Sequence, residues 1–315
     1  MTGLESLPSV RAEGQPLDAI RMGLGAWAWG DRSVWQYGRG YTDADIRQAF
    51  EASAAQGILL VDTAEVYGSG RSERLLGELV QQSSQKVLVA TKYFPWPWRL
   101  TSVSFLSALR GSLDRLGLAA VDLYQMHWPT PLLTPEYAME AMFACLRSGM
   151  CRAVGVSNFN QADMLRAYST LARHKVPLAS NQVHYSLLRR GAEKNGLLAR
   201  CEELGIRLIA YSPLEMGLLT GKYGPTRPPP GNRALRYAGL IGRIGPLLNV
   251  IADVGQEHGG KTNAQVALNW VMSKGALPIP GAKNAAQAQE NAGALGWDLT
   301  DEEVALLDAA SDRIS

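Results

Sequence analysis

The sequence predicts an α/β fold of the (β/α)8, or TIM barrel, class, and three observations support that prediction. Short apolar runs alternate with longer amphipathic stretches along the chain. The apolar runs are nearly continuous, as in parallel strands that are buried on both faces. Eight such strand–helix units fit into about 290 residues, and a barrel without insertions takes roughly 250. A doubly wound sheet is the alternative, but it usually carries a G-x-G-x-x-G motif after a strand, and this sequence has none.

The predicted strands and helices follow one another along the chain. The strands are the apolar runs at 21–25, 58–62, 87–92, 121–127, 153–157, 178–184, 207–211 and 277–280. The helices are the segments with apolar residues at helical spacing, at 43–56, 72–82, 102–116, 135–148, 161–173, 193–204 and, as a pair, across 247–273. No Ser/Gly-rich linker interrupts this order, so residues 19–315 are predicted to form a single domain. Residues 1–18 contain acidic residues and no apolar core, and we expect a leader or local hairpin rather than a signal peptide.

One long irregular segment, residues 221–233, follows the seventh predicted strand and is rich in Pro and Gly. Such a stretch fits neither a helix nor a central strand, and long loops inside compact domains are often functional. We expect a lid-like loop at the C-terminal face of the barrel, where barrel enzymes have their active sites. A tolerated surface insertion is the alternative.

Composition and charge exclude several classes of function. The 31 Lys and Arg residues are balanced by 29 Asp and Glu residues without a clustered basic run, so no nucleic-acid partner is expected. No stretch of 18 uncharged apolar residues is present, and we expect no membrane-spanning helix. Cys145, Cys151 and Cys201 have neither zinc-site nor disulfide spacing. We therefore expect no metal site and a reducing, cytoplasmic compartment.

Residues 255–262 match the P-loop pattern G-x-x-x-x-G-K-[ST], but their context does not fit that function. A P-loop needs a preceding strand, so that backbone amides and a helix start converge on phosphate. Here residues 247–254 have helical spacing, and the glycines that follow suit a helix end. Thr262 and Gln265 suit a capping box that opens another helix. We predict a joint between two helices, and no nucleoside triphosphatase.

Four ionisable residues are placed at or just after the ends of three successive predicted strands. Asp62 ends the second strand, and Tyr67 follows it. Lys92 ends the third strand, and His127 ends the fourth. Consecutive strand ends are neighbours in a barrel, so these side chains are expected to meet at one mouth. A charged residue on an apolar strand is costly unless it is paired, which makes Asp62 and Lys92 the expected ion pair.

These four residues and several further motifs resemble the aldo-keto reductase family, and the resemblance runs from about residue 20 to residue 308. The further motifs are Gly155-Val-Ser-Asn-Phe159, Asn181-Gln182, Ala210-Tyr-Ser-Pro-Leu214, Gly221-Lys222, and Ile279-Pro-Gly281 followed by Gln287-x-x-Glu290-Asn291. In that family the residues at the positions of the four ionisable residues form a catalytic tetrad. The resemblance implies an enzyme that reduces the carbonyl group of a small molecule with NADPH.

The resemblance also implies a role for each member of the tetrad. Tyr67 would protonate the developing alkoxide while a reduced nicotinamide delivers hydride to the carbonyl carbon. A phenol has an ordinary pKa of about 10, which is high for a proton donor at neutral pH. The Lys92 ammonium would lower the pKa of Tyr67, and Asp62 would hold Lys92 in place. His127 would hydrogen-bond the carbonyl oxygen and orient the substrate.

Cofactor contacts follow from the resemblance by position. Ser157, Asn158 and Gln182 would hold the nicotinamide carboxamide, and Tyr211 would stack on its ring, with Trp27 beside it. The residues expected along the pyrophosphate are Ser212, Pro213, Leu214, Lys222 and, with weaker support, Arg233. The residues expected at the adenosine end are Gly281, Lys283, Gln287, Glu290 and Asn291, for which an ordinary final barrel helix is the alternative.

The adenosine end departs from the best-known members, which carry Arg at the position of Gln287 to bind the 2′-phosphate. The potassium-channel β-subunit branch is similar in having Gln there. Lys283 lies nearby, and an ammonium can neutralise a phosphate without the bidentate fork of Arg. NADPH is therefore expected in preference to NADH.

Tryptophans are concentrated in the loops around the predicted mouth. Trp27, Trp96 and Trp128 are the expected substrate-pocket residues, which favours aromatic or bulky carbonyl compounds. For Trp35 and Trp98 the sequence leaves two alternatives open: they line the pocket, or they anchor their loops. A narrower resemblance, to the plant-chloroplast and cyanobacterial branch that includes pyridoxal-reductase-like proteins, makes a pyridoxal substrate a hypothesis.

Two other functions remain as alternatives. One is a weakly catalytic NADP(H)-binding subunit resembling the channel β-subunits, which carry Asn at the position of His127. The retained histidine favours the enzyme. The other is a (β/α)8 isomerase or aldolase in which Lys92 forms a Schiff base.

Overall fold

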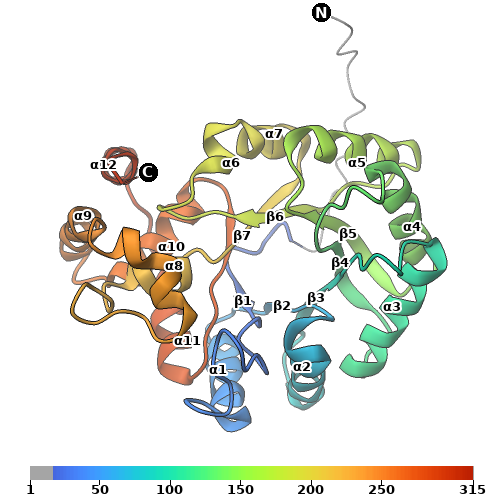
Figure 1. The fold of residues 1–315 in the computed structure, drawn as a ribbon, viewed down its shortest axis with the longest axis horizontal. Coiled ribbons are helices and arrows are strands. Elements are labelled where there is room, and N and C mark those ends of the chain that lie inside the picture. Colours follow the sequence, from blue (N-terminus) through green and yellow to red (C-terminus); the bar gives the residue numbers. More distant parts are fainter. Residues whose placement is uncertain (1–16, 315) are drawn as a thin grey trace, which may run out of the picture.

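A computed structural model describes residues 17–314, in which eight parallel strands form the predicted barrel. The strands are β1 (Gly23–Gly25), β2 (Leu60–Asp62), β3 (Leu88–Tyr93), β4 (Val121–Met126), β5 (Cys151–Ser157), β6 (Ser180–His184), β7 (Arg207–Tyr211) and β8 (Leu277–Ile279). Each pairs with the next in chain order, so the C-terminal ends of all strands face the same side. Figure 1 shows the strands at the centre and the helices around them.

The barrel closes where β1 meets the end of β8. The Gly25 N–H donates to the Pro280 carbonyl oxygen at 3.0 Å, and Gly25 forms a parallel bridge with Gly281. A Cβ on Gly25 would lie 2.8 Å from the carbonyl oxygen of Ile279, closer than side chains come to backbone. Glycine at this position therefore lets the first and last strands approach each other.

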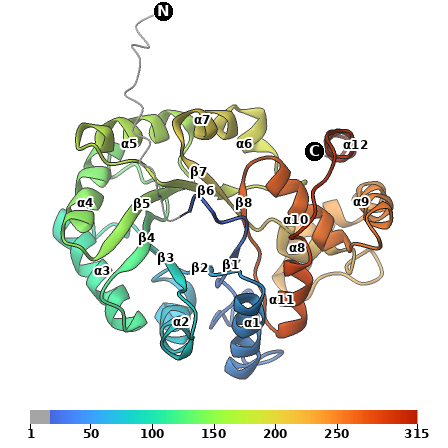
Figure 2. The same ribbon diagram turned by 180° about the vertical axis from the view of Figure 1, so that it is seen from behind.

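Helices cover the outside of the barrel in both views (Figures 1 and 2). They are α1 (Asp43–Ala55), α2 (Arg71–Gln82), α3 (Ser102–Leu116), α4 (Pro135–Arg147), α5 (Gln161–Arg173), α6 (Gly191–Lys194), α7 (Leu197–Leu204), α8 (Asn232–Ile241), α9 (Gly245–Glu257), α10 (Asn263–Ser273), α11 (Ala285–Ala292) and α12 (Asp301–Asp312), with 3-10 segments η1 (Tyr67–Gly70) and η2 (Glu215–Thr220). Several start at a side chain that caps the first turn: Thr101, Thr134 and Asn160 each accept a backbone N–H there.

Two apolar layers hold the barrel together. A small cluster inside the barrel contains Leu17, Ala179 just before β6, and residues of β2, β3, β4, β5, β7 and β8, among them Leu60, Leu123 and Ile209. The larger layer lies between the strands and the surrounding helices. Continuous apolar strands supply both layers, because alternate residues point inward and outward.

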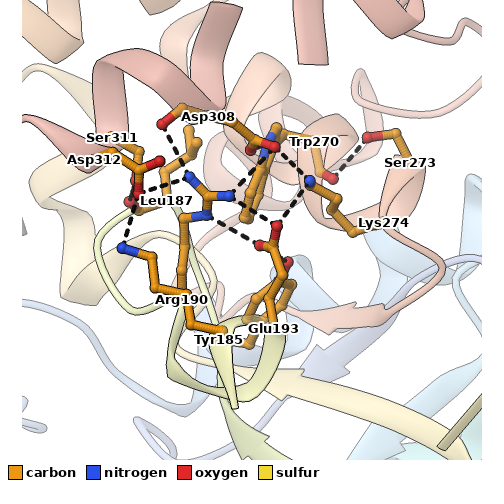
Figure 3. A network of polar contacts seen from close by, with 11 residues as sticks. Tyr185, Leu187, Arg190, Glu193, Trp270, Ser273, Lys274, Asp308, Ser311 and Asp312 are labelled. Atoms are coloured by element: carbon orange, nitrogen blue, oxygen red, sulfur yellow. Dashed lines mark hydrogen bonds and ion pairs between the residues drawn. The ribbon is translucent and has the colours of Figure 1, made fainter. Parts of the chain in front are cut away.

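Helices α9 and α12 lie outside the ring of barrel helices (Figures 1 and 2). A polar network joins α12 to α6 and α10. Arg190 pairs with Glu193 at 2.7 Å, Asp308 at 3.3 Å and Asp312 at 3.1 Å. Lys274 of α10 binds both Glu193 and Asp308. Figure 3 shows these charged side chains converging around the Arg190 guanidinium, so that the last helix is fixed to the barrel by alternating charges.

The predicted fold class is confirmed, and each predicted strand overlaps an observed one. The joint predicted in place of a P-loop is also confirmed, since α9 ends at Glu257 and a Thr262–Gln265 capping box opens α10. Of the predicted leader, only residues 17 and 18 lie within the described part of the chain.

Two boundaries need correction. The helix predicted across 193–204 is divided into α6 and α7, because Gly196 between them takes a left-handed φ of 81°. The irregular segment predicted across 221–233 ends at Gly231, because α8 begins at Asn232 and includes Arg233. Helices α8 and α12 were not predicted. Within residues 17–314 no single helix is long and apolar enough to cross a membrane, and only the bent pair α8–α9 meets that test by length and composition.

Candidate active site

The carboxyl ends of β2, β3 and β4 bring the four predicted tetrad residues together. Asp62 is the last residue of β2, and Lys92 lies one residue before the end of β3. His127 follows β4 directly, and Tyr67 opens the short segment η1 after β2. These neighbouring strands are paired in register, so the side chains reach one side of the barrel mouth.

Asp62 and Lys92 form a buried ion pair. The Lys92 side chain is fully buried and that of Asp62 nearly so. Lys92 Nζ donates to Asp62 Oδ1 and to the carbonyl oxygen of Thr63 at 2.8 Å. The second carboxylate oxygen accepts from the Nε2 atoms of Gln182 at 2.8 Å and Gln125 at 3.2 Å. Both charges are therefore hydrogen-bonded, which a buried pair requires.

Tyr67 lies close to two other tetrad members, Lys92 and His127. Lys92 Nζ lies 5.1 Å from the centroid of the Tyr67 ring, and the His127 ring lies 5.6 Å away at an angle of 80°. Gly68 and Ser69 after it adopt left-handed backbone angles, which turn the chain sharply from β2 into α2. The phenol and the amine from separate barrel segments thus meet, as the resemblance implied.

Burial raises the pKa of Tyr67 well above its ordinary value, and the Asp62 carboxylate adds to the rise. The expectation of a lowered Tyr67 pKa is wrong in direction, because burial and the Asp62 carboxylate outweigh the stabilisation that the nearby Lys92 ammonium gives the phenolate. Burial lowers the pKa of Lys92, opposed by Asp62, and the ammonium is already bound by Asp62 and Thr63. Tyr67 is therefore fully protonated at neutral pH.

His127 is a buried, neutral imidazole. Burial, with the Lys92 charge as a smaller cause, lowers the pKa of His127 to about 3. Its Nδ1 is buried without a hydrogen-bond partner among residues 17–314. Its backbone N–H donates to the Tyr93 carbonyl oxygen at 2.9 Å, which fixes the loop after β4 to β3. A neutral imidazole has one N–H to donate and adds no charge to the site.

A cavity of about 530 Å³ opens at this mouth and connects the predicted residues. Asp62, Tyr67 and His127 line it at one end, as does Trp128. Every residue predicted to bind the cofactor also lines it: Trp27, Ser157, Asn158, Gln182, Tyr211, Ser212, Pro213, Leu214, Lys222, Arg233, Gly281, Lys283, Gln287, Glu290 and Asn291. Lys92 lies behind the lining. Trp96 does not line the cavity, because its ring stacks on Trp98 and leans on Phe94.

Side chains around Asn158 form a connected polar wall of the cavity. Asn158 has a left-handed φ of 62°, accepts the Tyr211 hydroxyl at 3.1 Å and donates to Ser157 Oγ at 3.0 Å. Ser157 Oγ in turn donates to the Gln182 carbonyl oxygen at 2.8 Å. The side-chain nitrogen of Gln182 donates to Asp62, so the side-chain oxygen of Gln182 is left to accept a hydrogen bond from a ligand. This wall offers the paired donors and acceptors that a carboxamide needs.

Four lysine and arginine residues line the cavity, and the three that were predicted as cofactor contacts, Lys222, Arg233 and Lys283, form the group of cavity cations. None of them forms an ion pair within residues 17–314. Arg233 is buried, and its Nε has no hydrogen-bond partner in the same part of the chain. Burial, then Arg233 and Lys222, lower the pKa of Lys283 to about 8. Glu290 lines the same cavity, but no ion pair joins it to these cations within residues 17–314. Neighbouring cations without ion-pair partners fit a ligand that carries several phosphates.

Two features of the site had no clear signal in the sequence. His184 ends β6, and its ring stacks on that of Tyr211 with the centroids 5.1 Å apart. His184 Nε2 is hydrogen-bonded to the carboxylate of the buried Glu215, 2.8 Å from Oε2. Its place at a strand end, the same signal that found His127, could have revealed it. Arg236 also lines the cavity, but it lies on α8, a helix that was not predicted.

Comparisons with known proteins agree with this geometry. The model of the aldo/keto reductase family matches residues 21–312. Pyridoxal reductase, chloroplastic, from Arabidopsis thaliana is 41% identical, covering 94% of this chain and 84% of the relative. Methylglyoxal reductase from Escherichia coli is 33% identical, covering 89% of this chain and 92% of the relative.

Solved structures give the same result. An aldo/keto reductase from Klebsiella pneumoniae in complex with NADP and acetate superimposes with a TM-score of 0.74 at 29% identity, covering 92% of this chain and 90% of that one. The matched region contains every strand of the barrel and every residue of the mouth described above. The chain therefore belongs to the aldo/keto reductase family.

Proposed function

We propose that the protein is an NADPH-dependent carbonyl reductase in which Tyr67 is the proton donor. The observation that carries the proposal is the content of one cavity. Tyr67 and His127 line it beside the buried Asp62–Lys92 pair, and three cations without ion-pair partners in the described chain line it as well. The Klebsiella relative, crystallised with NADP, supports the choice of cofactor.

The residues present fit this cofactor. The polar wall of Ser157, Asn158 and Gln182 would hold the nicotinamide carboxamide, and Tyr211 would face its ring. Arg233 and Lys222 would bind the pyrophosphate, and Lys283 would bind the 2′-phosphate. When bound, the reduced nicotinamide supplies the hydride for the carbonyl carbon.

The side chains of this chain then handle the oxygen of the substrate. His127 donates its single N–H to the carbonyl oxygen and orients it toward Tyr67. As the carbonyl carbon accepts hydride, the oxygen becomes an alkoxide, and the Tyr67 phenol gives it a proton. An alkoxide is a much stronger base than a phenolate, so a phenol with a raised pKa can still protonate it. The phenolate left behind lies beside the Lys92 ammonium, which stabilises it.

The aromatic walls near Tyr67 favour a planar substrate. The Trp27 ring lies 6.5 Å from the Tyr67 ring, and Trp128 lines the same end of the cavity. Flat rings gain contact area and stacking in such a slot. Together with the resemblance to a pyridoxal reductase, this supports aromatic aldehydes, pyridoxal among them, as substrates.

The test is NADPH consumption with pyridoxal and with 4-nitrobenzaldehyde, in the wild-type protein and in Tyr67→Phe. Removing the hydroxyl deletes the proton donor and leaves the ring, so kcat should fall by about a hundredfold or more. The Kd for NADPH, measured by calorimetry, should stay within about twofold. Retained turnover in Tyr67→Phe would mean that another acid donates the proton. Tight NADPH binding without turnover in the wild-type protein would instead favour a cofactor-binding subunit.

A further inference from the structure

The segment between β1 and α1 folds over the cavity and brings Trp35 into its lining. Asp31 shapes this segment, because its carboxylate accepts the Val34 N–H at 2.8 Å and the Ser33 hydroxyl at 3.0 Å. The carbonyl oxygen of Asp31 also accepts the Tyr37 N–H at 2.9 Å. Trp35 is thus presented from a hydrogen-bonded turn rather than from a loose loop.

Trp35 contacts two of the three cavity cations. Lys283 Nζ lies 4.7 Å from the centroid of the Trp35 ring and 3.3 Å from its carbonyl oxygen. The Arg233 guanidinium carbon lies 5.0 Å from the same ring. The two cations come from different elements, since Arg233 is on α8 and Lys283 follows β8. One indole therefore connects three separate segments around the cavity.

An aromatic face holds a cation without neutralising it. A carboxylate partner would bind Lys283 or Arg233 more strongly, but it would also compete with an incoming phosphate and repel it. A ring face attracts the cation through its quadrupole and leaves the full positive charge available. Asp31, the acid that acts on Lys283, is occupied by the hydrogen bonds of its own turn. Lys283 Nζ also lies 4.7 Å from the centroid of the Tyr41 ring, and the Arg233 guanidinium carbon lies 5.8 Å from that of the Tyr223 ring. Ring faces rather than carboxylates therefore hold both cations, and Trp35 is the ring that they share.

The polar atoms nearby are also unsatisfied. Trp35 Nε1 and Arg233 Nε are both buried without a hydrogen-bond partner within residues 17–314. A buried indole N–H or guanidinium N–H normally has an acceptor, and none of the side chains around these two atoms provides one. Two buried N–H groups without acceptors are unfavourable in the free protein, and an anionic ligand would supply the missing acceptors.

We propose that Trp35 is a positioning residue that sets the preference for NADPH over NADH, by holding Lys283 and Arg233 on its indole ring so that both face the phosphates of the cofactor. The proposal rests on the proposed function, because it assumes that Lys283 binds the 2′-phosphate. It adds a specificity-determining residue from the β1–α1 segment, which contacts the predicted cofactor residues Lys283 and Arg233.

The test compares Trp35→Leu, which removes the aromatic face, with Trp35→Phe, which keeps a face and removes the N–H. Trp98→Leu is the matched control, since Trp98 is an exposed loop tryptophan outside the cavity lining. For each variant the Kd values of NADPH and NADH are measured by titration calorimetry. Circular dichroism and thermal midpoints check that each variant is folded.

In Trp35→Leu the ratio of the NADH Kd to the NADPH Kd should fall by about fivefold or more, because Lys283, which would bind the 2′-phosphate, loses its contact with the indole ring. In Trp35→Phe and in Trp98→Leu the ratio should stay within about twofold of wild type. The pH at which NADPH binding weakens should also rise in Trp35→Leu, because Lys283 becomes more exposed and leaves Arg233 and Lys222.

An unchanged ratio in Trp35→Leu would overturn the proposal, and so would a Trp35→Phe variant that loses as much as Trp35→Leu. Lys283→Met, measured in parallel, separates this failure from that of the proposed function. If Lys283→Met removes the preference for NADPH and Trp35→Leu does not, only the role of Trp35 is wrong. If Lys283→Met also leaves the ratio unchanged, the assignment of the 2′-phosphate to Lys283 is wrong, and the proposal falls with it.

Discussion

The affinity for NADPH should depend on pH through Lys283. The pKa of this ammonium is lowered to about 8 by burial and by the charges of Arg233 and Lys222, with Asp31 opposing them. A bound 2′-phosphate would bring a negative charge beside it and raise its pKa in the complex. Binding therefore takes up a proton when Lys283 is neutral beforehand. The contribution of Lys283 is complete below pH 8 and is lost as the pH rises through 8.

The magnitude follows from the fraction of charged Lys283 in the free protein. With a pKa of about 8, roughly nine-tenths of the molecules carry the charge at pH 7 and roughly one-tenth at pH 9. The Kd for NADPH should then rise by about tenfold over this range, or about 1.4 kcal/mol of binding free energy. The 2′-phosphate does not contribute, because its second pKa is about 6 and it is a dianion throughout.

Titration calorimetry at several pH values measures this change, and two controls isolate its source. NADH shares the nicotinamide end of the cavity but lacks the 2′-phosphate, so its Kd should change little over the same range. Lys283→Met should bind NADPH more weakly at pH 7 and with little dependence on pH. The reasoning is refuted if Lys283→Met retains the tenfold change, because the titrating group would then lie elsewhere.

Two further predictions concern stability. Lys92→Met should destabilise the protein by about 3–5 kcal/mol, because it leaves the buried Asp62 carboxylate unpaired; adding Asp62→Asn should recover part of that loss, and strictly additive urea-unfolding results would show that the pair is not coupled. Gly77→Ala should lower the thermal midpoint, because a Cβ on α2 would overlap the carbonyl oxygen of Leu116 and cost about 1–3 kcal/mol. Gly111→Ala on α3, where the nearest atom is the end of the Arg115 side chain, should be neutral or stabilising by up to about 1 kcal/mol, and equal effects at both positions would contradict the packing argument.

Much of the fold could be predicted because buried parallel strands have a strong and local sequence signal. The runs ending at Asp62 and Lys92 are apolar apart from the functional residue, so both the strand and the exception are visible. Helix starts were also local: the Thr262–Gln265 capping box distinguished a helix start from a phosphate loop. The residues at the mouth then followed from the rule that consecutive strand ends are neighbours.

What could not be predicted depends on contacts between distant segments. Helix α8 follows a Pro/Gly-rich stretch, and its buried residues Tyr237 and Ile241 pack on parts of the chain that the sequence does not place beside them. The Gln182 side-chain amide donates a hydrogen bond to Asp62, 120 residues away along the chain, and the place of Gln182 in the sequence does not reveal this contact. The direction of the Tyr67 pKa was wrong for the same reason. The sequence shows an amine near a phenol but does not show how deeply the phenol is buried, and burial is the largest cause of the raised pKa of Tyr67.

The buried cations around the cavity are held by two different kinds of partner, and the proposed function explains the difference. In the proposed mechanism, Lys92 keeps the same surroundings before and after a proton leaves Tyr67, because the Asp62 carboxylate and the Thr63 carbonyl oxygen hold it throughout. Lys283 and Arg233 would be neutralised by the phosphates of a bound ligand. In the free protein they lie over an indole ring, which a phosphate need not displace. A carboxylate at Trp35 would stabilise the protein alone and weaken phosphate binding. Under the proposed function, the cations held on aromatic faces would mark the part of the cavity that receives the phosphates of the cofactor.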